Sequence, residues 1–322
     1  MTALVPLNNA NALPRLHEAG VGEVYLGFHD DEWERRFGRA ELNRMSGFGR
    51  EANPFDFEQA CALAAQAHAL DMRAFMCFNA ASYSADQFAF IAQVYLPSLA
   101  IAGCHGVILS SQALIEDARE AGLDVTMSTL AGIYNAQLAA YYRDRGATRV
   151  IVPRDLSLDE IAGIMRAVPD LEYEVFLMRN GCLFSDSHCL GCHRAGKPSL
   201  CMSLRTGRWR IAPADGMVDD AFLQRAWENE RILNENYHRR TCGLCALWRF
   251  EQMGVDAYKV VGRGDDVDDL CFDAALVVRN AALARACATE EEYLERMERP
   301  RDPATLCGMR GLSCYYPDTR YF

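Results

Sequence analysis

Short runs of apolar, β-branched and aromatic residues recur along the whole chain, and most are followed by a helical pattern. The runs are apolar at nearly every position rather than at alternate positions, which is typical of strands buried on both faces of a parallel sheet. Eight strands are therefore predicted, at Leu4–Leu7, Glu23–Phe28, Arg73–Asn79, Gly106–Ser110, Asp124–Thr129, Arg149–Pro153, Tyr173–Met178 and Ala257–Val261.

The helical patterns between these strands carry their own start signals. Ser84 with Gln87, and Ser157 with Glu160, have the spacing of a capping box just before apolar residues at helical intervals. A last helix is expected from Asp265 onward. The segments between strands are therefore predicted to be helices that cover a sheet.

Eight alternations of strand and helix within 322 residues predict an α/β fold, a TIM-barrel-like (β/α)8 domain. A doubly wound open sheet is the alternative, because periodicity does not show whether a sheet closes. Two connections, 29–54 and 179–256, are unusually long, and connections of this length are usually functional. Both would leave from the carboxyl ends of strands, the face where barrel active sites lie. We expect a single domain over 1–322, with a cysteine-rich insertion at 179–256 between the seventh and eighth strands and a C-terminal tail at 287–322.

The composition is that of a soluble globular protein, with 50% hydrophobic and 24% charged residues. No stretch approaches the roughly 18 unbroken apolar residues of a membrane-spanning helix. The N-terminus lacks the basic and apolar segments of a secretory signal, so a cytoplasmic protein is expected. The 33 Lys and Arg are outnumbered by 44 Asp and Glu. Because nucleic-acid binders usually present a basic surface, this balance favours a small-molecule substrate and counts against nucleic acid.

Cysteine is the unusual component, with 13 residues. An odd number in a chain without an export signal counts against a disulfide framework. Six cysteines lie in one polar segment, at Cys182, Cys189, Cys192, Cys201, Cys242 and Cys245. Thiolates bind zinc or iron–sulfur clusters; zinc sites usually use closely spaced pairs, whereas clusters accept wider spacing. Spacing alone leaves zinc and iron–sulfur open, and the clustering disfavours ordinary buried thiols.

Several segments spread over residues 1–285 carry the motifs of one known family. They are Val24–Phe28, Phe55–Phe57, Met76–Asn79, Val152–Ile161, Glu174–Cys189 and Cys242–Arg263. Together they resemble the collagenase-like peptidase family U32. One departure is that the family usually has His-Gly before its first cysteine, where this chain has Met178–Gly181.

The resemblance implies a TIM-barrel-like domain that carries a [4Fe–4S] cluster. The implied ligands are Cys182, Cys189, Cys201 and Cys242, with Cys192 and Cys245 as alternates. For many members it implies oxygen-independent hydroxylation rather than proteolysis. The better understood branches add oxygen to ubiquinone precursors, ribosomal RNA or tRNA, with prephenate implied as oxygen donor.

Length and negative charge favour the small-molecule branch, whose members tend to pair with a homologous partner subunit. Two alternatives remain at this point. One is a zinc-stabilised, non-catalytic subunit or scaffold. The other is a peptidase, for which the sequence offers neither an H-E-x-x-H nor a G-x-S-x-G motif.

Five polar residues are expected around the mouth of the barrel, because each falls at the carboxyl end of a predicted strand. They are Asn79, Ser110, Ser128, Arg154 and Arg263. No catalytic residue is identified, and Asn79, Arg154 and Arg263 are the candidates. The two arginines could clamp a carboxylate in a bidentate manner, which would suit a dicarboxylate such as prephenate. The alternative for either arginine is a salt bridge between neighbouring loops.

Overall fold

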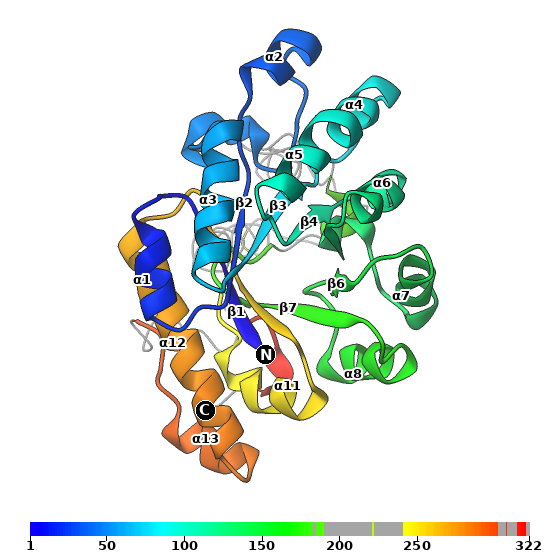
Figure 1. Cartoon of the computed structure of the whole chain (residues 1–322). Coiled ribbons are helices and arrows are strands. Elements are labelled where there is room, and N and C mark those ends of the chain that lie inside the picture. Colours follow the sequence, from blue (N-terminus) through cyan, green and yellow to red (C-terminus); the bar gives the residue numbers. More distant parts are fainter. Residues whose placement is uncertain (183–184, 190–220, 222–240, 302–306, 308–313, 320–322) are drawn as a thin grey trace.

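The computed structural model describes residues 1–182, 185–189, 221, 241–301, 307 and 314–319, and it contains a closed barrel of eight parallel strands (Figure 1). The ring closes because β8 pairs with β1, with Leu4 opposite Lys259. The strands are β1 (Thr2–Pro6), β2 (Glu23–Leu26), β3 (Arg73–Phe78), β4 (Gly106–Leu109), β5 (Asp124–Met127), β6 (Arg149–Ile151), β7 (Glu172–Met178) and β8 (Ala257–Val260). The predicted barrel is confirmed, and the open sheet is excluded.

The strands form where continuous apolar runs predicted them, and their burial gives the reason. Every residue of β2, β4 and β6 is buried. Strands in a barrel of this kind face packed side chains on the inside and helices on the outside, so polar alternation would place polar groups in one of the two cores.

Helices surround the ring on its outer side (Figure 1). The α-helices are α1 (Ala12–Glu18), α2 (Asp31–Phe37), α3 (Phe57–Ala69), α4 (Ala85–Phe90), α5 (Leu96–Ile101), α6 (Ile115–Glu120), α7 (Ala136–Arg143), α8 (Leu158–Ala167), α11 (Leu247–Met253), α12 (Val267–Ala286) and α13 (Glu290–Arg296). The shorter turns are η1 (Ser46–Glu51), the π-helical η2 (Ile91–Tyr95), η3 (Gln112–Leu114), η4 (Thr129–Ala131), η5 (Asp186–His188), η7 (Leu244–Ala246) and η8 (Pro317–Thr319).

The predicted helix starts are confirmed. Both capping boxes form, at Ser84 with Gln87 before α4 and at Ser157 with Glu160 before α8. The last predicted helix is α12, which the Asp266 side chain caps. None of the described helices is long and apolar enough to span a membrane.

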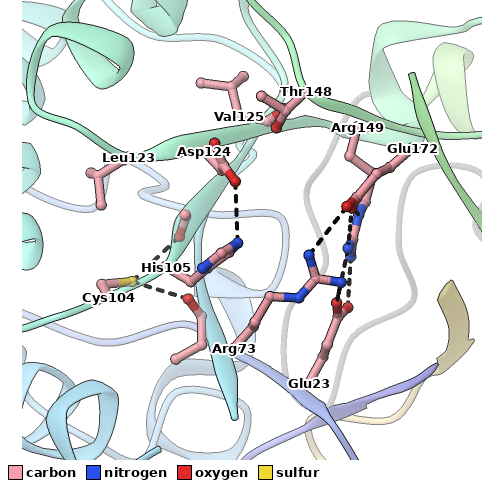
Figure 2. A network of polar contacts seen from close by, with 12 residues as sticks. Glu23, Arg73, Cys104, His105, Leu123, Asp124, Val125, Thr148, Arg149 and Glu172 are labelled. Atoms are coloured by element: carbon pink, nitrogen blue, oxygen red, sulfur yellow. Dashed lines mark hydrogen bonds and ion pairs between the residues drawn. The ribbon is translucent and has the colours of Figure 1, made fainter. Parts of the chain in front are cut away.

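The amino-terminal end of the barrel is occupied by paired charges (Figure 2). Glu23, Arg73, Arg149 and Glu172 are the first residues of β2, β3, β6 and β7. Arg149 donates from Nη1 and Nη2 to the Glu23 carboxylate, at 2.6 and 2.8 Å, and from Nε to Glu172 at 2.7 Å. Arg73 pairs with both acids. Residues at this end of a barrel serve stability, so function is sought at the opposite, carboxyl-terminal mouth.

Candidate functional site at the barrel mouth

The five polar residues expected at the mouth lie at the carboxyl ends of their strands. Asn79, Ser110 and Ser128 immediately follow β3, β4 and β5, while Arg154 and Arg263 come three residues after β6 and β8. Both serine hydroxyls are used within turns: Ser110 donates to a carbonyl in the loop after β3 at 2.6 Å, and Ser128 accepts from an amide of η4 at 3.3 Å. The side chain of Asn79 accepts from a backbone amide of the loop after β2 at 3.2 Å. These three residues shape the mouth by holding its loops.

A buried carboxylate, Asp186, joins the loop after β7 to three other loops at this mouth. Nε of Arg154 lies 2.8 Å from Oδ2 of Asp186, and Nη1 of Arg44 lies 2.8 Å from Oδ1. The hydroxyl of Thr129, the first residue of η4 after β5, also donates to Oδ2 at 3.2 Å. The Asp186 side chain is 0% exposed, so its own loop after β7 meets the loops after β2, β5 and β6 in a contact that excludes water. Sequence analysis identified neither Asp186 nor Arg44.

The two arginines decide the ionisation of Asp186. Burial alone would raise the pKa of this carboxyl group, but the charges of Arg154 and Arg44 lower it to about 2. The group is therefore ionised at neutral pH, and two cations around one anion leave a net positive charge. Arg154 also lies over the Phe176 ring at 4.0 Å and donates to the Asn180 carbonyl at 2.9 Å. The carboxylate that Arg154 contacts in the structure thus belongs to the protein itself.

The chain turns sharply just before the first cysteine of the insertion. Arg179 and Asn180 have φ angles of 67° and 42°, in the left-handed region that few residues other than glycine occupy. Ion pairs hold the turn, with Arg179 at 3.0 Å from Asp265 and 2.7 Å from Asp273. Strained backbone of this kind persists where the surroundings fix it, often at functional sites. The turn follows directly on β7, at the carboxyl end of the barrel.

The cysteine-bearing segments meet beside this turn. Cys182 precedes Asp186 by four residues and Cys189 follows it by three, so the ion pairs of Asp186 hold the segment that carries both. The amide immediately before Cys182 donates to the side-chain hydroxyl immediately before Cys242, at 3.1 Å. Two segments distant in sequence, which carry three of the predicted ligands, therefore lie next to each other at the carboxyl end of β7.

The C-terminal tail adds a cysteine that sequence analysis did not place. A β-bridge pairs Cys314 with Cys242, and the Tyr315 amide donates to the Cys242 carbonyl at 2.9 Å. The Tyr316 hydroxyl donates to the Phe176 carbonyl at 2.8 Å, and both tyrosines are buried. The tail thus docks on β7 and brings its thiol to the insertion. The only sequence signal was a Cys-Tyr-Tyr run rich in aromatic residues.

The Cys242 thiol lies in a cysteine-rich neighbourhood. Burial raises its pKa, a backbone amide of η7 opposes the rise, and the nearby thiols of Cys245, Cys314 and Cys307 add to it. Thiolates close to one another repel, and a bound metal cation reverses this balance. The donor set has the chemistry of a soft-metal site.

The predicted ligands are described only in part. Cys182, Cys189, Cys242 and Cys245 are all half-buried, whereas Cys192 and Cys201 lie outside the described residues. Within the described ranges, no three His, Cys, Asp or Glu side chains are grouped closely enough to hold a metal ion. The ligand set therefore stays a prediction, as do the catalytic candidates Asn79, Arg154 and Arg263.

Comparison with known proteins identifies the family. The model of peptidase family U32 matches residues 8–304, which is most of the chain. The chain belongs to peptidase family U32. The resemblance drawn from the sequence motifs is thereby confirmed. A solved structure with the same family name, the U32 peptidase Mk0906, is similar at 13% identity and a TM-score of 0.47, over 81% of this chain and 93% of that one.

Curated relatives of the chain are named for tRNA hydroxylation. It is 30% identical over 159 residues to tRNA hydroxylation protein P of Haemophilus influenzae, covering 48% of this chain and 34% of that protein. It is 24% identical over 234 residues to tRNA hydroxylation protein P1 of Bacillus subtilis, covering 66% and 52%. The matches thus span a third to a half of these relatives' own length. Their names do not support the expectation, drawn from the acidic charge, that nucleic acid is an unlikely substrate.

Proposed function

We propose that this chain takes part in oxygen-independent hydroxylation, with a [4Fe–4S] cluster held at the mouth of the barrel. One observation carries the proposal: in a U32 family member with relatives named for hydroxylation, the segments bearing Cys182 and Cys242 meet at the carboxyl end of β7. This is the face on which barrel enzymes act.

The cysteines between residues 182 and 245 fit such a cluster chemically. Cys182, Cys189, Cys201 and Cys242 would supply four thiolates, with Cys192 and Cys245 as alternates. A cluster with four thiolates is anionic, and the net positive charge of Arg44 and Arg154 around Asp186 would stabilise it. When bound, the group supplies one-electron redox chemistry, and its potential responds to nearby charge. Zinc at the same thiolates, in a non-catalytic subunit, is the alternative.

Two substrate classes follow from different observations. The acidic composition favours a small molecule, with prephenate as oxygen donor and a homologous subunit as partner. The names of the relatives favour tRNA as a second candidate. Arg263 and Asn79 lie at the mouth where either substrate would approach.

The experiment compares cells that are grown without oxygen and produce the wild-type protein, the Cys182→Ser variant or the control variant Cys104→Ser. Cys104 is a buried thiol just before β4, at the amino-terminal end of the barrel. Mass spectrometry of tRNA nucleosides and of small metabolites should find a species one oxygen heavier with wild type and with C104S but not with C182S. A heavier nucleoside would identify tRNA, and a heavier metabolite a small molecule. The same products from C182S as from wild type would refute the proposal.

A further inference from the structure

Arg263 differs from the other cations near the mouth because its charge has no partner in the described residues. Arg44, Arg154, Arg179 and the buried Lys259 each form an ion pair with a carboxylate, at 2.6–3.0 Å. Arg263 is only 5% exposed, yet within the described part of the chain it forms no ion pair. Burying a cation without an anion is costly, so a guanidinium whose charge the described residues leave uncompensated is suited to bind an anion.

Arg263 is positioned over the interior of the barrel at the end of β8. A Cβ placed on Gly27, just after β2, would lie 2.2 Å from Nη1 of Arg263. The guanidinium therefore packs directly against bare backbone, and the absence of a side chain at Gly27 permits the approach. Burial raises the pKa of Tyr25 and of Cys77, and the charge of Arg263 opposes the rise at both. The guanidinium thus lies near side chains of β2 and β3, which are two and three strands along the ring from β8.

One buried asparagine from the long loop after β2, itself held by a second, accepts a hydrogen bond from one nitrogen of this guanidinium. Oδ1 of Asn53 accepts from Nη1 of Arg263 at 3.2 Å and from Nδ2 of Asn43 at 3.1 Å. Nδ2 of Asn53 donates to the Met45 carbonyl at 3.2 Å, so the asparagine is anchored on its other side as well. Asn43 is 0% exposed and Asn53 is 2% exposed. Neither amide can neutralise the cation.

A guanidinium has five N–H donors in a planar fork that matches a carboxylate or a phosphate group. In the described residues, the contact with Asn53 is the single hydrogen bond of Arg263. The edge formed by Nε and Nη2 has no partner among those residues. It is the edge that a bidentate oxyanion would use.

We propose that Arg263, held by Asn53, is the anion-binding group of the mouth and takes one oxyanion, a carboxylate or phosphate group, of the substrate. Arg154, already paired with Asp186, holds loops instead. This inference rests on the proposed function only in assigning the bound oxyanion to the substrate of hydroxylation. Oxyanion binding itself is measurable without turnover.

The test measures binding of two probes, succinate and inorganic phosphate, by calorimetry and thermal shift on full-length protein isolated without air. The variants are Arg263→Gln, Arg263→Lys and the control Arg279→Gln, whose side chain is half exposed on α12 and paired with Glu298. At least one probe should bind wild type and R279Q with equal affinity. Binding to R263Q should be at least tenfold weaker, as expected from loss of a charged hydrogen-bonded pair. R263K keeps the charge without the fork and should fall between them.

Binding of succinate would indicate that the site takes a carboxylate, and binding of inorganic phosphate would indicate a phosphate group. The proposal is overturned if neither probe binds wild type, or if R263Q binds as wild type does. If R263Q is unfolded, R263K decides the matter, because unchanged affinity in that variant would contradict a bidentate site. Metal content is read on the same samples. If the protein contains no metal but its probe binding still depends on Arg263, the proposed function is contradicted and the oxyanion site at Arg263 is supported.

Discussion

The Asp186 carboxylate shows how one residue can hold the mouth together. It is fully buried, and its two oxygens meet Arg154 and Arg44 from different loops. Removing one partner of a buried ion pair costs far more than the pair itself contributes, because the remaining charges lose their compensation. Asp186 also lies between Cys182 and Cys189, so its loss should loosen the segment that presents both thiols.

We predict that Asp186→Asn lowers the free energy of unfolding at pH 7 by about 3 kcal/mol, because it removes the anion from the buried guanidinium of Arg154 and from the partly buried one of Arg44. The pKa of Asp186 is lowered to about 2 in the folded protein, so its contribution is present above the ordinary value near 3.8 and is lost as pH falls toward 2. The difference between wild type and D186N in urea unfolding should therefore shrink below about pH 4.

The control for this experiment is Asp170→Asn. Asp170 pairs with Arg143 but is 61% exposed, and exposed ion pairs contribute little to stability because water screens them. Equal losses in D186N and D170N, or a difference independent of pH, would contradict the role given to Asp186.

At the scale of elements, the C-terminal tail is the part that sequence reasoning placed least well. The spacing of its cysteines did not indicate that they approach the insertion, yet a β-bridge pairs Cys314 with Cys242. Such a contact depends on where β7 ends and on how the tail returns to it, which local periodicity does not report. By contrast, the helix starts at Ser84 and Ser157 were predictable, because a capping box involves only neighbouring residues.

Tyr316→Ala should destabilise the protein by about 3 kcal/mol, measured by urea unfolding. The ring of Tyr316 packs on Phe250 with centroids 4.8 Å apart, and its hydroxyl donates to the Phe176 carbonyl. Tyr316→Phe should cost only about 1 kcal/mol, because only the hydrogen bond is lost. Ile101→Ala, at a residue that is 88% exposed, is the control. A Y316A protein as stable as I101A would show that the tail is not docked in solution.

At the scale of the whole molecule, the fold was more predictable than the site. Eight continuous apolar runs predicted eight strands because strands in a parallel barrel are buried on both faces. The closure that periodicity could not decide is the pairing of β8 with β1. The polar residues that follow the strands were also predicted to lie at the mouth, and they do. In a parallel barrel, the carboxyl ends of all strands are at the same end.

The different roles of Arg154, which pairs with Asp186, and of Arg263, which contacts Asn53, were not predictable from the sequence. It depends on Asp186 reaching one arginine and on Asn53 reaching the other, and both contacts link loops that are distant in sequence. Sequence alone showed two arginines at one mouth. The structure separates a paired arginine from one whose charge has no partner in the described residues.

The central claim is that thiolates from separate segments hold an iron–sulfur cluster at the carboxyl-terminal mouth of this barrel. The most direct test is to measure iron, labile sulfide and zinc per chain in protein purified without air, for wild type, Cys182→Ser, Cys242→Ser and the control Cys104→Ser. We predict four irons and four sulfides per chain in wild type and C104S, and a clear loss of both in C182S and C242S. One zinc without sulfide, or full iron content in C182S and C242S, would contradict the account.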